Sequence, residues 1–289
     1  MYNKFIDRLL DNDPKQVLSK GSIRARKIIS PILRFAIPFV TPNSKLRVLR
    51  RVKLPKQPVI FAPTHGFRED IEHTLLMAGR QAYVLNGSLT QLYRSIDGVA
   101  SWLAGVIPID RTKKESRASA KKKLVYALEL GASVIMYPEG TWNKSPNQLM
   151  SGLFPGVYDV AKESRALVVP IATYRNGKNA YGIMEEAFDI CTYDRTTGIQ
   201  VLRDKLATMQ YGLMEQYGQA KRTDFPCGEE ADAYWKSYVD NLMAQVKYYD
   251  YDVELHTKYV DKNITSPQEA FAHLKFLEVK KENAFLWRQ

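Results

Sequence analysis

Apolar residues in the middle of the chain follow two alternating patterns. Short apolar runs rich in β-branched and aromatic residues, bounded by Gly, Pro or Asn, predict buried strands. These runs span residues 58–62, 82–85, 106–109, 133–137 and 167–172. The stretches between them predict helices over residues 70–78, 89–103, 114–130 and 156–164. Strands that alternate with helices predict an α/β fold, a largely parallel sheet flanked by helices, with reactive residues at the carboxyl ends of the strands.

Both ends of the chain depart from this alternation. After about residue 190, apolar residues recur at three- and four-residue steps, as on one face of a helix. They are Ile199, Leu202, Leu206, Met209, Leu213 and Tyr217, then Tyr234, Trp235, Tyr238, Leu242, Val246 and Tyr249. We therefore expect three regions: a basic amphipathic segment (1–56), an α/β core (57–190) and a helical C-terminal extension (191–289).

Positive charge is concentrated in the first region of a chain whose formal net charge is +11. Up to residue 56, only Asp7, Asp11 and Asp13 oppose many Lys and Arg side chains. Bulky apolar residues between positions 28 and 39 are mixed with these cations, a combination that suits an anionic membrane surface. A solvated basic face on a core-packed helix is the alternative. Nucleic acid is the weakest candidate partner, because the apolar cluster has no role there and no nucleic-acid motif accompanies it.

Composition and apolar stretches indicate the cellular compartment in which we expect the protein. The chain has 289 residues, 45% of them hydrophobic and 25% charged, as in ordinary folded proteins. Cys191 and Cys227 form no metal-type cluster, so we expect a reducing compartment and neither a disulfide framework nor a structural zinc. The longest apolar stretch, residues 28–40, is too short to span a bilayer and contains two prolines and an arginine. With acidic residues where a signal peptide would be apolar, we expect a cytoplasmic protein, peripheral on the inner face of the membrane.

One histidine stands where catalysis is expected. His65 follows the strand at 58–62, and Asp70 opens the helix at 70–78. A carboxylate bound to one ring nitrogen fixes the tautomer and leaves the other nitrogen able to take a proton from a hydroxyl. His with Asp five residues later is common by chance, and a helix-capping Asp70 beside a loop histidine is the alternative.

Three later segments strengthen the catalytic interpretation of His65 and Asp70. Gly105-Val-Ile-Pro-Ile-Asp-Arg111 ends one strand on an arginine, Tyr137-Pro-Glu139-Gly140-Thr141 ends the next on a carboxylate and a glycine, and a third strand contains Pro170. In order and spacing, residues 61–172 resemble the glycerolipid acyltransferase family of lysophosphatidate-acyltransferase-like proteins, with its His-x4-Asp and Phe-Pro-Glu-Gly-Thr motifs.

The resemblance implies a role for each matching residue. His65 would be the general base that deprotonates an acceptor hydroxyl, and Asp70 would orient it. Arg111 would bind the acceptor phosphate. Binding of the acceptor would also involve Glu139, Gly140 and Thr141, whereas Pro170 would shape the acyl region. Transfer would be direct from acyl-CoA or acyl-carrier protein to a lysolipid, with no metal and no other cofactor. The chain has no Gly-x-Ser-x-Gly nucleophile motif and no P-loop, in agreement with direct transfer.

Two departures from the family pattern leave the acceptor open. Trp142 and Asn143 stand where relatives usually carry Arg and then Ser or Asn, and Pro155 stands where many carry Lys. Two expected cations are therefore missing. A glycolipid or another lysolipid is thus a candidate acceptor beside 1-acylglycerol-3-phosphate.

Two other functions compete with acyl transfer. His65, Glu69 and His73 lie at four-residue steps, as zinc ligands of a hydrolase would on one helix face. Gly66 and Pro63 place His65 before the helix, which argues against that arrangement. The other rival is a non-catalytic lipid-binding protein with the same fold, which the missing arginine at position 142 would suit.

Overall fold

The computed structural model describes residues 7–10, 12–41, 44–87, 102–143 and 149–218, together with the single residues 233 and 237. Most of the helix expected over residues 89–103 lies outside these residues. So does nearly all of the second C-terminal helix, expected around residues 234–249.

Seven strands form one sheet in the order β1-β7-β6-β2-β5-β3-β4. They are β1 (Lys45–Arg50), β2 (Val59–Pro63), β3 (Ala82–Asn86), β4 (Val106–Pro108), β5 (Ser133–Ile135), β6 (Leu167–Asn176) and β7 (Asn179–Met184). Every neighbouring pair is parallel except β6 and β7, which form an antiparallel hairpin. The prediction of a largely parallel α/β sheet is confirmed, and β2 to β6 correspond to the five expected strands.

Two strands, β1 and β7, were not predicted from the sequence, and they pair with each other. In β1 only Leu46 and Val48 are partly buried, and the exposed residues are Lys45, Arg47, Leu49 and Arg50. The sheet therefore begins at Lys45, within the region that we expected to be a separate basic segment.

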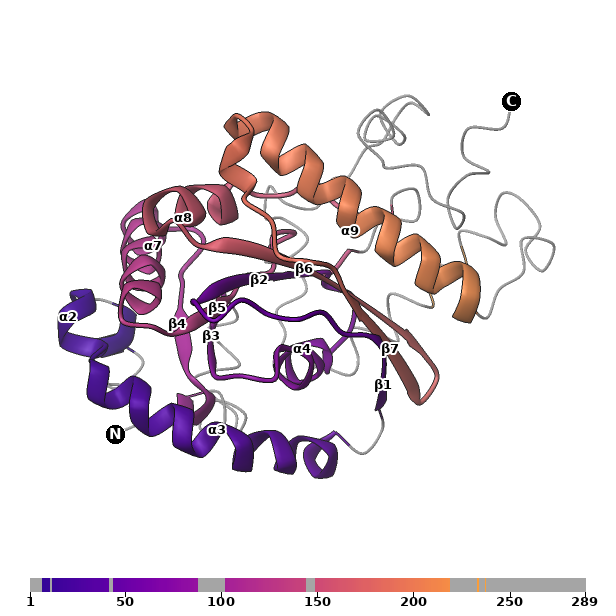
Figure 1. The fold of residues 1–289 in the computed structure, drawn as a ribbon, viewed down its shortest axis with the longest axis horizontal. Helices are drawn as coiled ribbons and strands as arrows, with labels where there is room; N and C mark the ends of the chain where they lie inside the picture. The colour runs from indigo at the N-terminus through magenta and orange to yellow at the C-terminus, as the bar shows by residue number, and fades with distance from the viewer. Residues whose placement is uncertain are drawn as a thin grey trace.

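Helices cover both faces of the sheet (Figure 1). They are α2 (Pro14–Val17), α3 (Lys20–Val40), α4 (Asp70–Ala78), α7 (Lys114–Glu129), α8 (Gly156–Ser164) and α9 (Arg195–Tyr217), with a 3-10 turn at Ile190–Thr192. Helices α4 and α8 begin and end at the residues expected from the sequence. The side chains of β2 alternate between two cores: Ile60 and Ala62 face the core shared with α7, α8 and α9, whereas Val59 and Phe61 face the core shared with α4.

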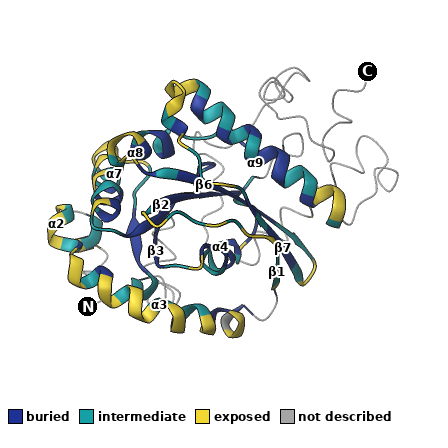
Figure 2. Ribbon diagram, viewed as in Figure 1, coloured by how far each residue is buried: buried dark blue, intermediate teal, exposed yellow. Residues whose placement is uncertain are grey.

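Helix α3 runs along the edge of the sheet where the parallel strands begin (Figure 1). Ser19 caps its first turn, and Ile23 and Ile37 are buried. The Arg26 guanidinium donates to Tyr83 Oη at 3.2 Å and to the carbonyl oxygens of Trp102 and Leu103. These contacts hold the helix against β3, while much of its length stays exposed (Figure 2). None of the helices in the described ranges combines the length and the apolar character required to cross a bilayer.

One carboxyl group is buried in the α9 core. Asp204 is 1% exposed, and neither of its oxygens has a hydrogen-bond partner among the described residues. Burial raises the pKa of Asp204 to about 8, against a small opposing effect of Arg203. The folded protein therefore holds this carboxyl in its neutral form at pH values where an unfolded chain would ionise it.

This carboxyl makes stability depend on pH. Because its folded pKa lies above its ordinary value of 3.8, its contribution to stability is complete below pH 4 and is lost as pH rises toward about 8. Asp204→Asn should raise the free energy of unfolding by about 1–3 kcal/mol at pH 8 and by much less at pH 5. Urea unfolding at the two pH values measures this gain, with Glu215→Gln on the exposed side of the same helix as control. Equal effects of Asp204→Asn at both pH values would contradict a neutral Asp204.

Candidate active site

His65 lies just past the carboxyl end of β2, which is near the middle of the sheet between β6 and β5. The strand pairing continues to Thr64, whose N–H donates to the Ile171 carbonyl at 2.9 Å. The chain then turns, and the His65 carbonyl accepts from the Asn143 N–H at 3.1 Å. His65 thus lies in the loop between β2 and α4, with its side chain 17% exposed. It is reachable from solvent but held by backbone bonds on both sides.

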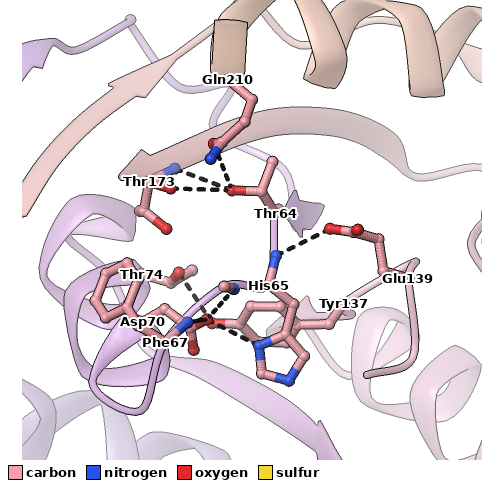
Figure 3. A network of polar contacts seen from close by, with 10 residues as sticks. Thr64, His65, Phe67, Asp70, Thr74, Tyr137, Glu139, Thr173 and Gln210 are labelled. Atoms are coloured by element: carbon pink, nitrogen blue, oxygen red, sulfur yellow. Dashed lines mark hydrogen bonds and ion pairs between the residues drawn. The ribbon is translucent and has the colours of Figure 1, made fainter. Parts of the chain in front are cut away.

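Asp70 holds this loop through a single oxygen. It is the first residue of α4 and is fully buried. Its Oδ2 accepts from His65 Nδ1 at 2.8 Å, from the Gly66 N–H at 2.9 Å and from the Phe67 N–H at 3.3 Å (Figure 3). The amino end of α4 further favours a negative charge there. The same carboxylate therefore fixes both the loop backbone and the imidazole.

This contact sets the tautomer of His65. A neutral imidazole has one donor and one acceptor nitrogen. Because an ionised carboxylate only accepts, Nδ1 carries the proton and Nε2 is left as the acceptor. The ring therefore presents a basic nitrogen on the side away from Asp70 (Figure 3).

Two aromatic side chains flank the His65 ring. The Tyr137 ring lies 4.3 Å away, centroid to centroid, and tilted by 37°, and its hydroxyl bonds Thr74 Oγ1 at 3.1 Å. Trp142 meets the imidazole edge-on at 5.9 Å and packs in a buried cluster with Phe67. From the sequence, we interpreted Trp142 only as the loss of an arginine and expected no role for Tyr137. Their position directly around Glu139 in the sequence was the signal that it left unused.

Glu139 is buried and joins two loops. Its Oε1 accepts from the His65 N–H at 3.1 Å, and its Oε2 accepts from the Ser151 N–H at 3.0 Å. Burial raises the pKa of Glu139 to about 7, although both amide bonds favour the ionised form. Both oxygens thus support the backbone of the site. The contact with acceptor hydroxyls expected from the family resemblance stays a prediction.

Arg111 reaches the same edge of the sheet from the loop after β4. Its guanidinium donates to the Gly140 carbonyl. Gly140 has φ +72°, a conformation that favours glycine, and a Cβ there would lie 2.7 Å from the Phe154 ring. On the other side, a Cβ at Gly87 would lie 2.8 Å from Arg111 Nε. Gly87 therefore makes room for the arginine, which is half-buried beside the Glu139 loop, and Gly140 makes room for Phe154.

The other two expected residues lie in the framework of the site. Thr141 is buried, 4% exposed, between Gly140 and Trp142. Pro170 lies in β6 opposite Ala62 of β2, three residues before His65, and its carbonyl accepts from the Glu185 N–H at 3.0 Å. Pro170 is thus part of the sheet beneath the loop.

A hydrogen-bond network that the sequence did not reveal links the site to α9 (Figure 3). Thr64 Oγ1 accepts from the Thr173 N–H at 3.0 Å and lies 3.4 Å from Gln210 Oε1. Because Gln210 is 146 residues from Thr64 along the chain, no local pattern could have paired them.

The proposed zinc ligands do not share a helix face. His65 precedes α4 and binds Asp70, whereas Glu69 pairs with Arg175 at 2.8 Å. His73 is buried beside Phe67, and burial lowers the pKa of His73. Within the described ranges, no three His, Cys, Asp or Glu side chains are arranged to hold a metal ion.

Comparisons with known proteins identify what this chain is similar to. Residues 45–174 match the family model described as Acyltransferase. The chain is 30% identical over 142 residues to 1-acyl-sn-glycerol-3-phosphate acyltransferase LPAT1, chloroplastic, of Arabidopsis thaliana, covering 48% of this chain and 38% of that protein. It is 29% identical over 121 residues to the corresponding BAT2 protein of Brassica napus, covering 42% and 34%. The match thus spans less than half the length of either relative.

A solved structure shares the fold. The 1-acyl-sn-glycerophosphate (LPA) acyltransferase PlsC from Thermotoga maritima aligns with a TM-score of 0.56 and 14% identity, covering 76% of this chain and 90% of that one. At this identity the likeness concerns the fold alone.

The Asp70 contact predicts the protonation pattern of His65. In the native protein, ¹⁵N NMR should show a neutral His65 protonated on Nδ1 at alkaline pH. In Asp70→Ala, which removes the carboxylate, the ring should shift toward a mixture with the Nε2–H form. Asp194→Ala, which removes the carboxylate that caps α9, is the control variant and should leave the His65 spectrum unchanged. A native His65 protonated on Nε2 would refute the arrangement.

Proposed function

We propose that this chain, which belongs to the glycerolipid acyltransferase family, moves a fatty acyl group from an acyl thioester to a hydroxyl of a lysolipid. The observation that best supports this proposal is the 2.8 Å contact between Asp70 Oδ2 and His65 Nδ1, which holds the partly exposed imidazole ring of His65. It supplies an oriented base at the carboxyl end of a central strand, where α/β folds place their reactive groups.

The proposed reaction is a direct acyl transfer. His65 Nε2 accepts the proton of the acceptor hydroxyl as that oxygen attacks the thioester carbonyl carbon. The new C–O bond gives a tetrahedral oxyanion, and Asp70 stabilises the imidazolium through Nδ1–H. When the oxyanion collapses, the C–S bond breaks and the leaving thiolate takes the proton back from Nε2. The products are the acylated lipid and the free thiol of coenzyme A or acyl-carrier protein, with no acyl-enzyme.

The acceptor that we propose is 1-acylglycerol-3-phosphate or a related lysolipid or glycolipid. Arg111 supports a phosphate, because its planar guanidinium lies half-buried beside the Glu139 loop and suits phosphate oxygens. Trp142 supports a less charged acceptor, because an uncharged ring adjoins His65 where relatives usually have a cation. Incubation with a lysolipid panel and mass spectrometry of the products distinguishes the two.

The assignment of His65 makes a kinetic prediction. His65→Ala should lower kcat by about 10²–10⁴-fold, the usual contribution of a general base, with folding preserved by circular dichroism. The matched control is His73→Gln, which replaces a histidine of the neighbouring helix α4 and should keep most of the activity. Native-like activity in His65→Ala would refute the base. No transfer by the native protein to any acceptor of a broad panel would instead favour the lipid-binding alternative.

We further propose that the reaction takes place on the cytoplasmic face of a membrane, where anionic lipids attract basic proteins. Helix α3 supports this, because much of it is exposed (Figure 2) and several of its exposed residues are large and apolar. They are Ile28 at 74%, Ile32 at 68%, Phe35 at 73% and Phe39 at 72% exposed. Exposed Lys20, Arg24 and Lys27 lie on the same helix. Such a helix would lie in the bilayer interface with its apolar side chains among the acyl chains.

Sedimentation with vesicles tests this surface. The native protein should pellet with phosphatidylglycerol-containing vesicles, and less so at high salt. Ile32→Ser/Phe35→Ser should weaken partitioning by about tenfold or more, since each side chain otherwise leaves water. Leu49→Ser/Met214→Ser, at exposed apolar residues outside α3, is the matched control. Equal partitioning of both double variants would contradict docking through α3.

A further inference from the structure

A cavity of about 360 Å³ lies under α3, at the end of the sheet opposite to His65. Its walls come from α3 and from the residues that precede β2, β3 and β5. It is separated from His65 by the length of β2, about 17 Å for a five-residue strand. It is therefore distinct from the acyl-transfer site.

Four cations line this cavity, and its lining contains no acidic residue. Lys27 donates to the Gly131 carbonyl at 2.8 Å, and Arg34 donates to Ser30 Oγ at 3.3 Å. Arg80 donates to two backbone carbonyls before β2, at 2.8 and 3.1 Å. Lys56 completes the set. In the described part of the chain, none of the four forms an ion pair with a carboxylate, so their charges are uncompensated.

The electrostatics of the cavity also favour an anion. Burial lowers the pKa of Arg34, and the nearby cation Arg51 lowers it further, the signature of crowded like charges. A wall that contains fixed guanidinium and ammonium groups suits a phosphate with its several acceptor oxygens.

We propose that this basic cavity, formed by Lys27, Arg34, Lys56 and Arg80, is a second ligand site that binds a phosphate ester. Arg34 and Arg80 would donate planar guanidinium N–H groups to the phosphate oxygens, and Lys27 and Lys56 would add charge at the exposed mouth. The ester is either the headgroup of an anionic phospholipid or a water-soluble phosphate.

The cavity lies next to the exposed apolar face of α3. Lys27 and Arg34 belong to the helix whose neighbouring face carries Ile28, Ile32 and Phe35. A phosphate bound here would lie beside the apolar face of α3 and would tie that helix to the sheet. The site would thus sense or select anionic phosphate at the surface where α3 docks, independently of the chemistry at His65.

Site-specific lysine acetylation tests the proposal without an activity assay. The native protein is labelled with an acetylating reagent at constant ionic strength, with inorganic phosphate or short-chain, water-soluble phosphatidic acid replacing chloride. Peptide mass spectrometry then gives the labelling rates of Lys56 and Lys27. Both rates should fall severalfold, while those of exposed Lys53 and Lys162 stay constant. Tighter protection by the short-chain lipid assigns the site to a phospholipid headgroup, and equal protection assigns it to soluble phosphate.

Variants localise the effect. Arg34→Gln should raise the concentration of anion for half-protection of Lys56 by about tenfold, as expected for one lost charge-assisted hydrogen bond. Arg24→Gln, on an exposed face of the same helix, should not. If Arg34→Gln unfolds, Lys56→Gln with labelling read at Lys27 serves instead. The proposal is overturned if the labelling rates of Lys56 and Lys27 fall no more than that of Lys53. It is also overturned if protection survives in both Arg34→Gln and Lys56→Gln.

Discussion

The site depends on the buried carboxylate of Asp70. Its Oδ2 accepts three hydrogen bonds, from His65, Gly66 and Phe67. The carboxylate is fully buried, so without these donors its charge would be strongly unfavourable. The loop after β2 closes around it, and this closure holds the imidazole edge toward Asp70 and the opposite nitrogen outward. The contact that makes a buried Asp70 tolerable is thus the contact that would prepare His65 for its proposed role as a base.

The sheet brings the other parts of the site to this loop. β2 and β5 are neighbours, so Glu139 after β5 meets the backbone of His65, and Arg111 after β4 reaches Gly140. At the opposite end of the strands, α3 covers the sheet with a basic face and exposes an apolar one. In the proposed function, the fold therefore separates chemistry at the carboxyl ends of the strands from contact with anions and lipid at their beginnings.

Sequence patterns predicted the parts whose signals are local. Strands β2 to β6 and helices α4 and α8 have continuous apolar runs or helical spacing, and the motif order indicated which loops meet. The edge strand β1 was missed because its Lys and Arg side chains hide the alternation of Leu46 and Val48. The bonds of Glu139 to the backbone of His65 and Ser151 were not predicted, because they depend on how two loops pack. The pairing of Thr64 with Gln210 likewise arises only once α9 folds onto β6.

The central claim is that Asp70 acts through His65. A double-mutant cycle on kcat/KM with Asp70→Ala, His65→Ala and their combination tests it most directly, with whichever lysolipid serves as acceptor. If the two side chains form one unit, the double variant should be no slower than His65→Ala, because Asp70 has no other catalytic task. Losses that multiply in the double variant would show two independent contributions and would contradict the account.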